Sequence, residues 1–469
     1  MQALHSFSTP QLERIHRGKV RDSFRIDDAS RLLVASDRLS AFDSVLQTPI
    51  PGKGAILNRL SAHWFEETAD IVPNHMLRTV ADRAMVVREV EPIRVEMIVR
   101  AFITGSAWRA YAAGQRTLSG VTFPEGLSRN QRLPEPIVTP TTKSEHDAEI
   151  TPDEIVRQGL AEEAVYRRME EAALGLFAHA SARLLELGLH LVDTKYEFGL
   201  LDGEVILIDE IHTPDSSRFW AVDDYDRSPD LVSSWDKEYV RRWLLEEKEA
   251  GRSLSGLPEH VVDETAKRYA DLYERVTGSP PPPLPVDGAA DLVSDLVDAR
   301  LMKDASITIV MGSAADSEHA RSIAKHLDDY DVAVVLRVAS AHKTPGHVER
   351  LADELNASAE PGAVIAVAGL SNGLGGALAA NLNLPVINCP PFADREDMLL
   401  NLHSSLMMPS STPAMTVIKP QNAAQAALRA LNLPRLRTLA LDEIADRRRS
   451  LIESDDVLRM SDAAKGSGS

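Results

Sequence analysis

Apolar and polar positions alternate in two different ways along the chain, and the clearer pattern begins after residue 304. Short apolar runs there are separated by amphipathic runs of helical period. This alternation predicts a parallel sheet covered by helices, an α/β domain of flavodoxin-like three-layer type. The expected strands are residues 306–312, 331–340, 363–369 and 383–390, and the expected helices are 317–330 and 346–358.

The pattern before residue 279 is mixed. Residues 31–37 and 204–210 predict short buried strands that end in carboxylates. Residues 169–188 have the period of a long amphipathic helix that ends at a glycine. Residues 189–210 predict a hairpin that turns at Asp202-Gly203. This part is therefore expected to be α+β.

A proline-rich stretch, SPPPPLPVDG, separates the two patterns. Five prolines between residues 280 and 285 cannot continue a helix or pair inside a sheet, so we expect a stiff linker. A surface loop within one domain is the alternative. Apolar positions then predict a helix that docks on one of the domains. The expected divisions are residues 1–278, a linker with its helix at 279–304, a second domain at 305–460 and a flexible tail at 461–469.

Composition narrows the functional classes. The net charge of −19 argues against a nucleic-acid partner, although a few local cations can still bind small anions. A single cysteine, Cys389, excludes an internal disulfide and fits a reducing compartment. The N-terminus has no apolar signal core and no stretch could span a bilayer, so a cytoplasmic protein without a membrane partner is expected.

Three clusters in the first part suit anionic ligands. The run Arg17-Gly18-Lys19-Val20-Arg21-Asp22 predicts a phosphate-contacting turn, or else a solvated basic turn. Asp37 and Ser40 follow a strand end, a usual place for groups that face a ligand. In the third cluster, Glu96 precedes Arg100 and Ser106, and these last two, beside the turn at Gly105, could hold a ribose phosphate. The alternative is a salt-bridged strand and a tight turn.

A fourth cluster is more informative. Asp193, Lys195 and Glu197 alternate along one expected strand and share a face, and Asp209-Glu210 ends the partner strand. Acids and a lysine together suit Mg²⁺ and a nucleotide, because carboxylate oxygens bind the metal and the cation faces phosphate. An exposed polar face of a hairpin is the alternative. Arg218 follows in a loop as another candidate phosphate contact.

These segments together resemble the phosphoribosylaminoimidazole-succinocarboxamide synthase family. RGKVRDSF, SDRLSAFD, PIPGKGAILNRLS, VRAFITGSAW, PTTKSEHD, DTKYEFG and DEIHTPDSSRFW carry the resemblance, in order, over roughly residues 10–278. It implies an ATP-grasp-like α+β fold with ATP and Mg²⁺ between two lobes. It also implies a reaction that joins the carboxylate of carboxyaminoimidazole ribonucleotide to L-aspartate.

The resemblance further implies roles for single residues. Lys195 would act in catalysis, and Glu197 and Asp209 would hold Mg²⁺. The implied ATP contacts are Gly18, Lys19, Val20, Arg21, Glu96, Lys143 and Asp209. The implied substrate contacts are Asp37, Ser40, Arg100, Ser106 and Arg218.

In the second part, three strand ends carry candidate chemistry. Ser313 and Asp316 follow the first strand, Ser340 and His342 the second, and a glycine-rich run at 369–376 the third. Ligands of open parallel sheets gather at the carboxyl ends of strands, so these turns are expected to converge. His342 then lies where a base that titrates near neutrality is useful. Taken alone, a histidine in the packed core would be the simpler reading.

GSAAD, SAHKTP and the glycine-rich turn resemble the aminoimidazole ribonucleotide carboxylase/mutase family over roughly residues 305–433. Lys343 and the loop Ser371–Gly375 resemble the branch that carboxylates with CO₂ and without biotin, whereas Thr344 resembles the mutase branch. The resemblance implies catalytic roles for His342, Lys343 and Ser371. The implied substrate contacts are Ser313, Asp316, Ser340, Asn372 and Gly373.

The order of the two parts resembles the animal bifunctional enzyme of purine synthesis, in which the second domain makes the substrate of the first. The expected partners are therefore aminoimidazole ribonucleotides, CO₂, L-aspartate and ATP, and a homo-octamer built around the carboxylase domains. Two alternatives stay open: a mutase in the second part, or an inactive scaffold that only oligomerises the ligase.

Overall fold

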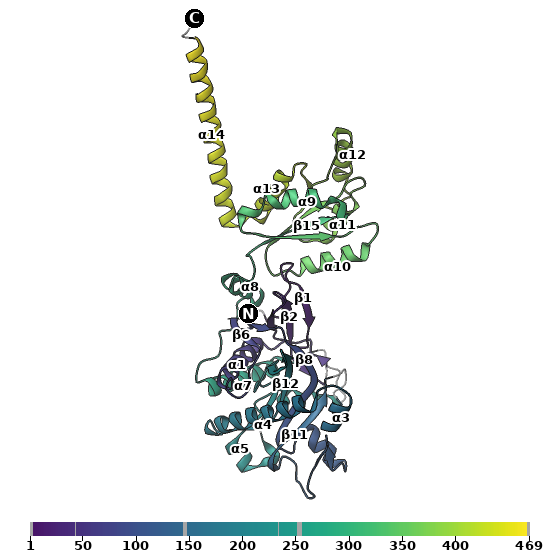
Figure 1. The fold of residues 1–469 in the computed structure, drawn as a ribbon, viewed down its shortest axis with the longest axis vertical. Helices are drawn as coiled ribbons and strands as arrows, with labels where there is room; N and C mark the ends of the chain where they lie inside the picture. Colours follow the sequence, from purple (N-terminus) through teal and green to yellow (C-terminus); the bar gives the residue numbers. More distant parts are fainter. Residues whose placement is uncertain (1–2, 43, 144–147, 233, 251–255, 467–469) are drawn as a thin grey trace. The chain divides into compact units, whose positions relative to one another are not determined.

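The computed structural model describes residues 3–42, 44–143, 148–232, 234–250 and 256–466 (Figure 1). The chain divides into two compact units. The first unit comprises Met1–Phe7 with Glu13–Leu296, and the second comprises Ser8–Leu12 with Val297–Ser469. Each unit has its own apolar core, as expected for a chain too long for a single core.

Two antiparallel five-stranded sheets form the frame of the first unit. The first has the order β1 (Arg14–Arg17), β2 (Arg21–Arg25), β3 (Ser30–Ala35), β7 (Ala84–Arg88), β6 (Met76–Ala81). The second has the order β11 (Arg132–Thr142), β8 (Glu91–Phe102), β12 (Leu189–Leu201), β13 (Glu204–Ile208), and β14 (Ser217–Ala221) also pairs with β12. Two short pairs, β4 (Ser40–Ala41) with β5 (Ser44–Val45) and β9 (Thr117–Leu118) with β10 (Val121–Thr122), complete the strands.

Helices cover these sheets. Helix α4 packs its apolar stripe, including Met169, Leu176 and Phe177, into the core shared with β8 and β12 (Figure 1). It ends before Gly188, whose φ of +71° stops the helix. The helices of this unit are α1 (Lys53–Glu67), α2 (Gly105–Ala112), α3 (Pro152–Arg157), α4 (Glu163–Glu186), α5 (Val222–Arg227), η1 (Pro229–Leu231), α6 (Glu238–Glu249), α7 (Glu259–Thr277) and α8 (Gly288–Asp298).

The expected hairpin is present. β12 and β13 pair antiparallel, and the turn residues Asp202 and Gly203 both have positive φ, +52° and +83°. This matches the primed turns that two-residue hairpins favour. The α+β prediction for the first part is confirmed.

The second unit contains a parallel sheet in the order β16 (Ala333–Val338), β15 (Ser306–Met311), β17 (Gly362–Val367), β18 (Val386–Asn388), β19 (Ala414–Thr416). Ile307 and Ile309 of β15 pack against α9 (Ser317–Lys325) and α13 (Pro420–Leu431). Val310 faces the other way, toward α10 (Pro345–Asn356) and α11 (Gly373–Asn381). The α/β prediction is therefore confirmed.

Several elements of the second unit were not expected. Two single turns, η2 (Ala314–Asp316) and η3 (Asp328–Tyr330), flank α9. Helix α12 (Arg395–Leu406) lies between β18 and β19, and α14 (Pro434–Gly466) extends away from the sheet of this unit (Figure 1). Apolar side chains of both helices are exposed, among them Leu399, Leu400 and Leu451.

Candidate functional sites

The basic turn before β2 is held by a buried ion pair. The Gly18 N–H donates to the carbonyl of Arg21 at 2.7 Å. The guanidinium of Arg38 donates to the carbonyls of Gly18 (3.0 Å) and Lys19 (3.1 Å) and pairs with Asp22 at 2.8 Å. Arg38 and Asp22 are both buried. The turn is thus fixed from inside the protein, while the Lys19 side chain is exposed.

Asp37, expected as a substrate contact, has no exposed surface. Its carboxylate accepts hydrogen bonds from the backbone of Leu4 (2.8 Å) and Gly54 (2.9 Å) and from Arg83 (3.2 Å). Its carboxylate therefore binds the start of α1 and the N-terminal segment, and its role as a substrate contact stays a prediction. Ser40 lies on the short strand β4 and is partly exposed.

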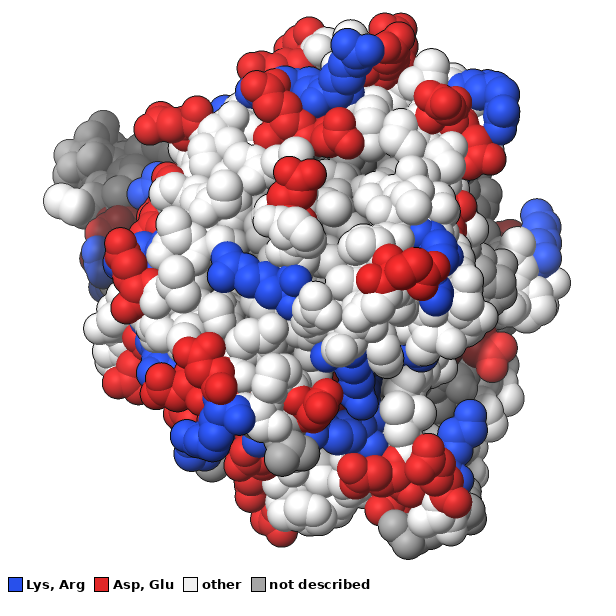
Figure 2. Space-filling model, turned by 90° about the horizontal axis from the view of Figure 1, so that it is seen from below, with Lys and Arg blue, Asp and Glu red and all other residues white. Residues whose placement is uncertain are grey.

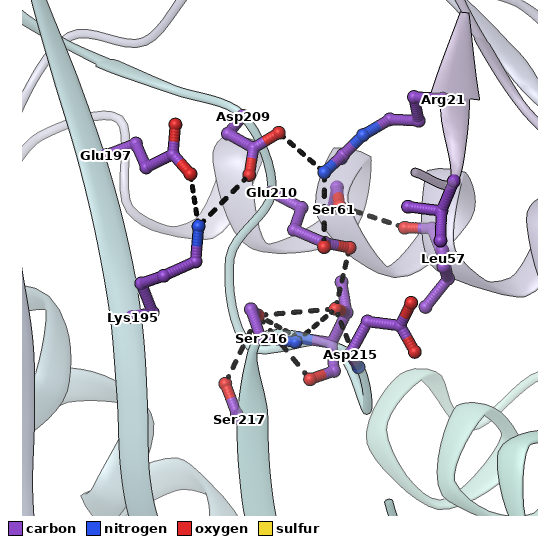
Figure 3. Close-up of polar contacts among 12 residues, drawn as sticks. Arg21, Leu57, Ser61, Lys195, Glu197, Asp209, Glu210, Asp215, Ser216 and Ser217 are labelled. Atoms are coloured by element: carbon purple, nitrogen blue, oxygen red, sulfur yellow. Dashed lines mark hydrogen bonds and ion pairs between the residues drawn. The ribbon is translucent and has the colours of Figure 1, made fainter. Parts of the chain in front are cut away.

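Three strands and one turn bring the acidic cluster together (Figure 3). Antiparallel pairing sets Glu96 of β8 opposite Glu197 of β12. The ammonium of Lys195 lies 3.1 Å from Glu96 and 3.7 Å from Asp209, and it also contacts Glu197. From β2, Arg21 reaches Asp209 at 2.5 Å.

Two further groups surround this cluster. Arg21 lies 3.1 Å from Glu210, and Lys143 forms an ion pair with Glu197. The residues that follow Lys143, 144–147 of the PTTKSEHD segment, lie outside the described residues. The structure thus joins Arg21, Glu96, Lys143, Lys195, Glu197 and Asp209, which the sequence analysis assigned to ATP, the metal or catalysis.

The charges of this cluster stabilise one another. Burial alone would raise the pKa of Asp209, but Arg21 and Lys195 lower it to about 2. Burial also disfavours the ammonium of Lys195, but Glu197, Asp209 and Glu96 raise its pKa well above its usual value. Both groups are therefore charged at neutral pH. Asp209 has a φ of +70°, a conformation that is strained for a non-glycine residue and frequent at functional sites.

The carboxylates of this cluster are also the candidate ligands of Mg²⁺. In the described part of the chain, no group of three or more His, Cys, Asp or Glu is arranged as a metal site. The carboxylates of Glu197 and Asp209 nevertheless lie close together, since both contact the ammonium of Lys195. They are the hard oxygen donors that Mg²⁺ prefers, and at present the Lys195 ammonium compensates their charge. The donor set therefore fits Mg²⁺.

A second group of polar residues surrounds Asp193, two positions before Lys195 on β12. Asp193 pairs with Arg218 at 2.5 Å and with Arg100 at 3.4 Å, and Arg100 donates to the hydroxyl of Ser106 at 3.3 Å. Gly105 has a φ of +58°, and a Cβ there would lie 2.8 Å from the Arg218 guanidinium. A side chain at this position would therefore displace the Arg218 guanidinium. Asp193 thus pairs with the two arginines, Arg100 and Arg218, whereas Lys195 pairs with Glu96, Glu197 and Asp209.

Sequence reasoning missed several buried groups beside these clusters. Lys53 pairs with Asp215 at 2.7 Å, and the Tyr269 hydroxyl donates to Asp215 at 2.8 Å. Burial raises the pKa of Asp236, near Arg218, to about 6. Lys53 lies in PIPGKGAILNRLS and Asp215 in DEIHTPDSSRFW, so the motifs contained both residues, but nothing in the sequence showed that they meet.

The second unit has a cavity of about 700 Å³ at the carboxyl ends of β15, β16 and β17. The three expected turns converge there. Its lining includes Ser313, Asp316, Ser340, His342, Ser371, Asn372 and Gly373. Partial burial raises the pKa of Asp316. Polar groups from three separate turns therefore share one cavity, as a small-molecule site requires.

Within this cavity, the glycine-rich turn and the histidine are in close contact. A Cβ on Gly373 would lie 2.8 Å from the His342 ring, so the absence of a side chain lets the two turns meet. Asn372 caps α11 by accepting from the Gly375 N–H at 3.1 Å. Lys343 is exposed and is not among the residues that line the cavity, although its N–H bonds to Ser340 at 3.2 Å.

Helix α12 supplies a support that sequence reasoning missed. The Asn401 side chain accepts from the Leu370 N–H at 2.7 Å and donates to the Pro391 carbonyl at 2.7 Å. Asn401 and Asp397 also line the cavity. None of the segments that carry the family resemblance in the second part (GSAAD, SAHKTP and the glycine-rich turn) includes α12.

Charged side chains of both signs lie on the face of the molecule that Figure 2 shows. On the face shown in Figure 2, blue and red side chains are interspersed, and no broad basic area covers the described residues there. In the part of the chain that the structure describes, no helix has the length and apolar character needed to cross a membrane.

Comparison with known proteins matches both halves. Residues 14–256, more than half of the chain, match the family model for SAICAR synthetase, and residues 306–449 match that for AIR carboxylase. A phosphoribosylaminoimidazole-succinocarboxamide synthase of Bacteroides fragilis is 44% identical over 281 residues, covering 58% of this chain and 90% of that protein.

Solved structures agree for the first unit. A SAICAR synthase from Saccharomyces cerevisiae, complexed with SAICAR, is 36% identical with a TM-score of 0.52, covering 58% of this chain and 96% of that one. A Treponema denticola PurE is 32% identical with a TM-score of 0.31, covering 32% of this chain and 97% of that one. The chain therefore belongs to the SAICAR synthetase family and carries an AIR carboxylase domain after its synthetase domain.

Proposed function

We propose that the chain is a bifunctional enzyme of purine biosynthesis. The second domain carboxylates aminoimidazole ribonucleotide with CO₂, and the first joins the product to L-aspartate with ATP, through an acyl phosphate. The convergence of Arg21, Lys195, Glu197 and Asp209 with the arginine pair on Asp193 is the observation that carries the ligase half.

The ligase must make a carboxylate reactive. A carboxylate is a poor electrophile, but transfer of the γ-phosphoryl group gives an acyl phosphate that an amine can attack. Such a reaction depends on positioning and on neutralising charge. Arg21 and Lys195 supply the cations for the phosphates, with the Gly18–Val20 backbone and Lys19, Lys143 and Glu96 as further nucleotide contacts. Arg100, Ser106 and Arg218 suit the ribonucleotide phosphate. Ser40 is a further candidate substrate contact by its resemblance to the family motif.

Glu197 and Asp209 would hold Mg²⁺, and the metal when bound would neutralise phosphate charge. Lys195 and Arg21 would then exchange part of their carboxylate contacts for phosphate contacts. Asp209→Asn tests this assignment. We expect aspartate-dependent ADP release to fall by a factor of about 100 or more with the fold intact. Near-normal turnover in that variant would reject the role of Asp209.

For the second domain, the cavity at His342 and the Ser371–Gly375 turn supports carboxylation. The substrate is an enamine, so its ring carbon attacks CO₂ directly, and that carbon's proton must then leave. His342 lies in the cavity as the proton acceptor, and the Ser371–Gly373 backbone is available to the new carboxylate. Ser313, Asp316 and Ser340 suit the ribonucleotide, and Lys343 lies beside the cavity.

A carboxylation assay separates this function from its alternatives. The wild type should consume aminoimidazole ribonucleotide with bicarbonate and CO₂ as the only carbon source, and no biotin. His342→Asn should abolish that activity while the ligase stays active. If the wild type converts only the nitrogen-carboxylated ribonucleotide, the mutase replaces the carboxylase; Thr344 is the residue that favours this reading. If neither substrate reacts, the domain is a scaffold.

A further inference from the structure

The N-terminal segment Ser8–Leu12 belongs to the second unit, although the residues on both sides of it belong to the first. On one side, Phe7 is buried against Phe24 with ring centroids 5.5 Å apart. On the other side, the Glu13 carbonyl accepts from the Arg25 N–H at 2.9 Å. The N-terminal part of the chain therefore contributes five residues to the second unit, and the residues before and after them belong to the first unit.

A buried carboxylate in the second unit depends on this segment. Glu360 is only 3% exposed, and within the described residues no ion pair involves it. One of its oxygens accepts from the Thr9 hydroxyl at 2.8 Å and from the Gln11 side-chain amide at 3.0 Å, and the other accepts from Ser358 at 2.9 Å. Two of these three donors thus come from the N-terminal segment.

The N-terminal segment also forms hydrogen bonds with backbone groups of the second unit. The Gln11 amide donates to the Lys303 carbonyl at 2.9 Å and accepts from the Lys303 N–H at 2.7 Å, as a peptide group of a neighbouring strand would. The Ala359 N–H donates to the Ser8 carbonyl at 3.0 Å. Polar groups at Lys303 and at residues 358–360 therefore pair with complementary groups on residues 8–12.

We propose that Ser8–Leu12 is a structural strap that completes the carboxylase unit, so that the two enzymes form an obligate fusion rather than two modules on a linker. The physical reason is the cost of a buried charge without donors. Hydrogen bonds to charged groups contribute more than neutral ones, and an unsatisfied buried carboxylate is strongly unfavourable. Without the strap, Glu360 keeps only Ser358.

The full chain provides a separate probe for each unit. Its five tryptophans all lie between residues 64 and 243, in the first unit. Its single cysteine, Cys389, is fully buried in the core of the second unit. Tryptophan fluorescence therefore follows unfolding of the first unit, and labelling of Cys389 by a thiol reagent follows opening of the second.

Two variants test the strap. Thr9→Val removes one donor with little change in shape, and Gln11→Glu replaces an amide donor with a carboxylate beside Glu360. We expect Cys389 labelling in moderate urea to accelerate about tenfold in Thr9→Val and more in Gln11→Glu, given the worth of hydrogen bonds to charged groups. The matched control is Glu13→Gln, whose side chain pairs with Arg25 in the first unit; it should leave the labelling rate unchanged.

Two results would overturn the proposal. One is a Cys389 labelling rate that stays at the wild-type value in both variants. The other is that Thr9→Val accelerates Cys389 labelling by the same factor in the wild type and in Glu360→Gln. If the strap acts through the Glu360 carboxylate, the effects of the two changes should not be additive. A faster labelling rate, together with non-additivity at Glu360, supports the strap whether or not either domain has its proposed activity.

Discussion

Lys53 is a lysine with no exposed surface, and its ammonium lies against Asp215. Burial would raise the pKa of Asp215, but Lys53 and Lys237, with hydrogen bonds from Lys53 and Tyr269, lower it to about 2. Asp215 is therefore charged at neutral pH. A buried charge of this kind depends on its partner, because water cannot replace it.

Lys53→Met should destabilise the first unit by about 3–5 kcal/mol, since it removes the cation that pairs directly with the buried Asp215 carboxylate. Tyr269→Phe is the matched comparison, since it removes only one hydrogen bond to the same carboxylate; we expect it to cost about 1.5–3 kcal/mol. Urea unfolding followed by tryptophan fluorescence measures both. Equal losses in the two variants would contradict the importance of the ion pair.

Asp236 provides a pH-dependent contribution. Burial raises its pKa from 3.8 to about 6, against the opposing effect of Arg218. The folded state therefore holds this proton more tightly than the unfolded state does. The resulting stabilisation is complete below about pH 3.8 and is lost as the pH rises through 6, by about 3 kcal/mol in total.

This contribution can be isolated with Asp236→Asn, which has no proton to bind. The free energy of unfolding of the wild type, minus that of the variant, should increase as the pH falls from 7 to 4. Tryptophan fluorescence in urea at several pH values gives this difference. A difference that is independent of pH would show that Asp236 titrates normally.

At the scale of single elements, the start of α2 shapes the arginine pair. Gly105→Ala would place a Cβ against Arg218 and also strain a backbone with φ of +58°. We expect the KM for the carboxylated ribonucleotide to rise about tenfold or more, because Arg218 would have to move. The free energy of unfolding should also fall by the cost of a left-handed alanine, about 1 kcal/mol.

Gly114→Ala, just after the same helix, is the matched control. Gly114 has a φ of +98°, and no atom lies within 4 Å of its would-be Cβ. It therefore carries the backbone strain without the contact to Arg218. The two variants should lose similar stability, and only Gly105→Ala should lose substrate affinity. A KM that is equal in both would exclude the contact as the cause.

The elements that the sequence predicted are those with a strong local pattern. Strands β15 and β17 are continuous apolar runs, and Asp202-Gly203 is a turn signal by composition. β19 was not predicted because its three residues, Ala414–Thr416, do not form an apolar or alternating run in the sequence. Helix α12 begins with a capping aspartate, Asp394, but that signal alone does not distinguish a helix from a loop.

Site residues were predictable only where a motif concentrated them. The cluster around Lys195 came from neighbouring motifs, whereas the Lys53–Asp215 pair joins positions 162 residues apart. The position of Asp37 after a strand is visible in the sequence, but its burial and its hydrogen bond to the backbone of α1 are not. Long-range pairing and burial depend on the packed fold, which a local pattern does not encode.

At the scale of the whole molecule, exposed apolar surface favours self-association. On α12, Leu399, Leu400 and Leu406 are 54%, 67% and 63% exposed, a concentration that is unusual on a monomer's surface. We expect the chain to form an octamer through its carboxylase domains, with α12 at an interface. Light scattering should therefore give the mass of eight chains of 51.4 kDa.

Leu399→Glu with Leu400→Glu should dissociate this assembly, since burying two carboxylates at an apolar contact is unfavourable. Leu185→Glu is the control, because Leu185 is also half-exposed but lies on α4 of the first unit. A wild type that scatters as a monomer at micromolar concentration would refute the octamer, and an intact octamer in the double variant would exclude α12.

The strap also sets an order of events during synthesis. Thr9 and Glu360 are 351 positions apart in the chain. At about 5–20 residues per second, a ribosome needs about 20–70 s to pass from one to the other. The sequence of the first unit is complete once Leu296 has been made, whereas residues 8–12 still lack Lys303 and Glu360 at that point. The N-terminal segment is thus among the first residues to leave the ribosome and among the last to reach their native contacts, so a chain that terminates early leaves it as a ready site for proteases and chaperones.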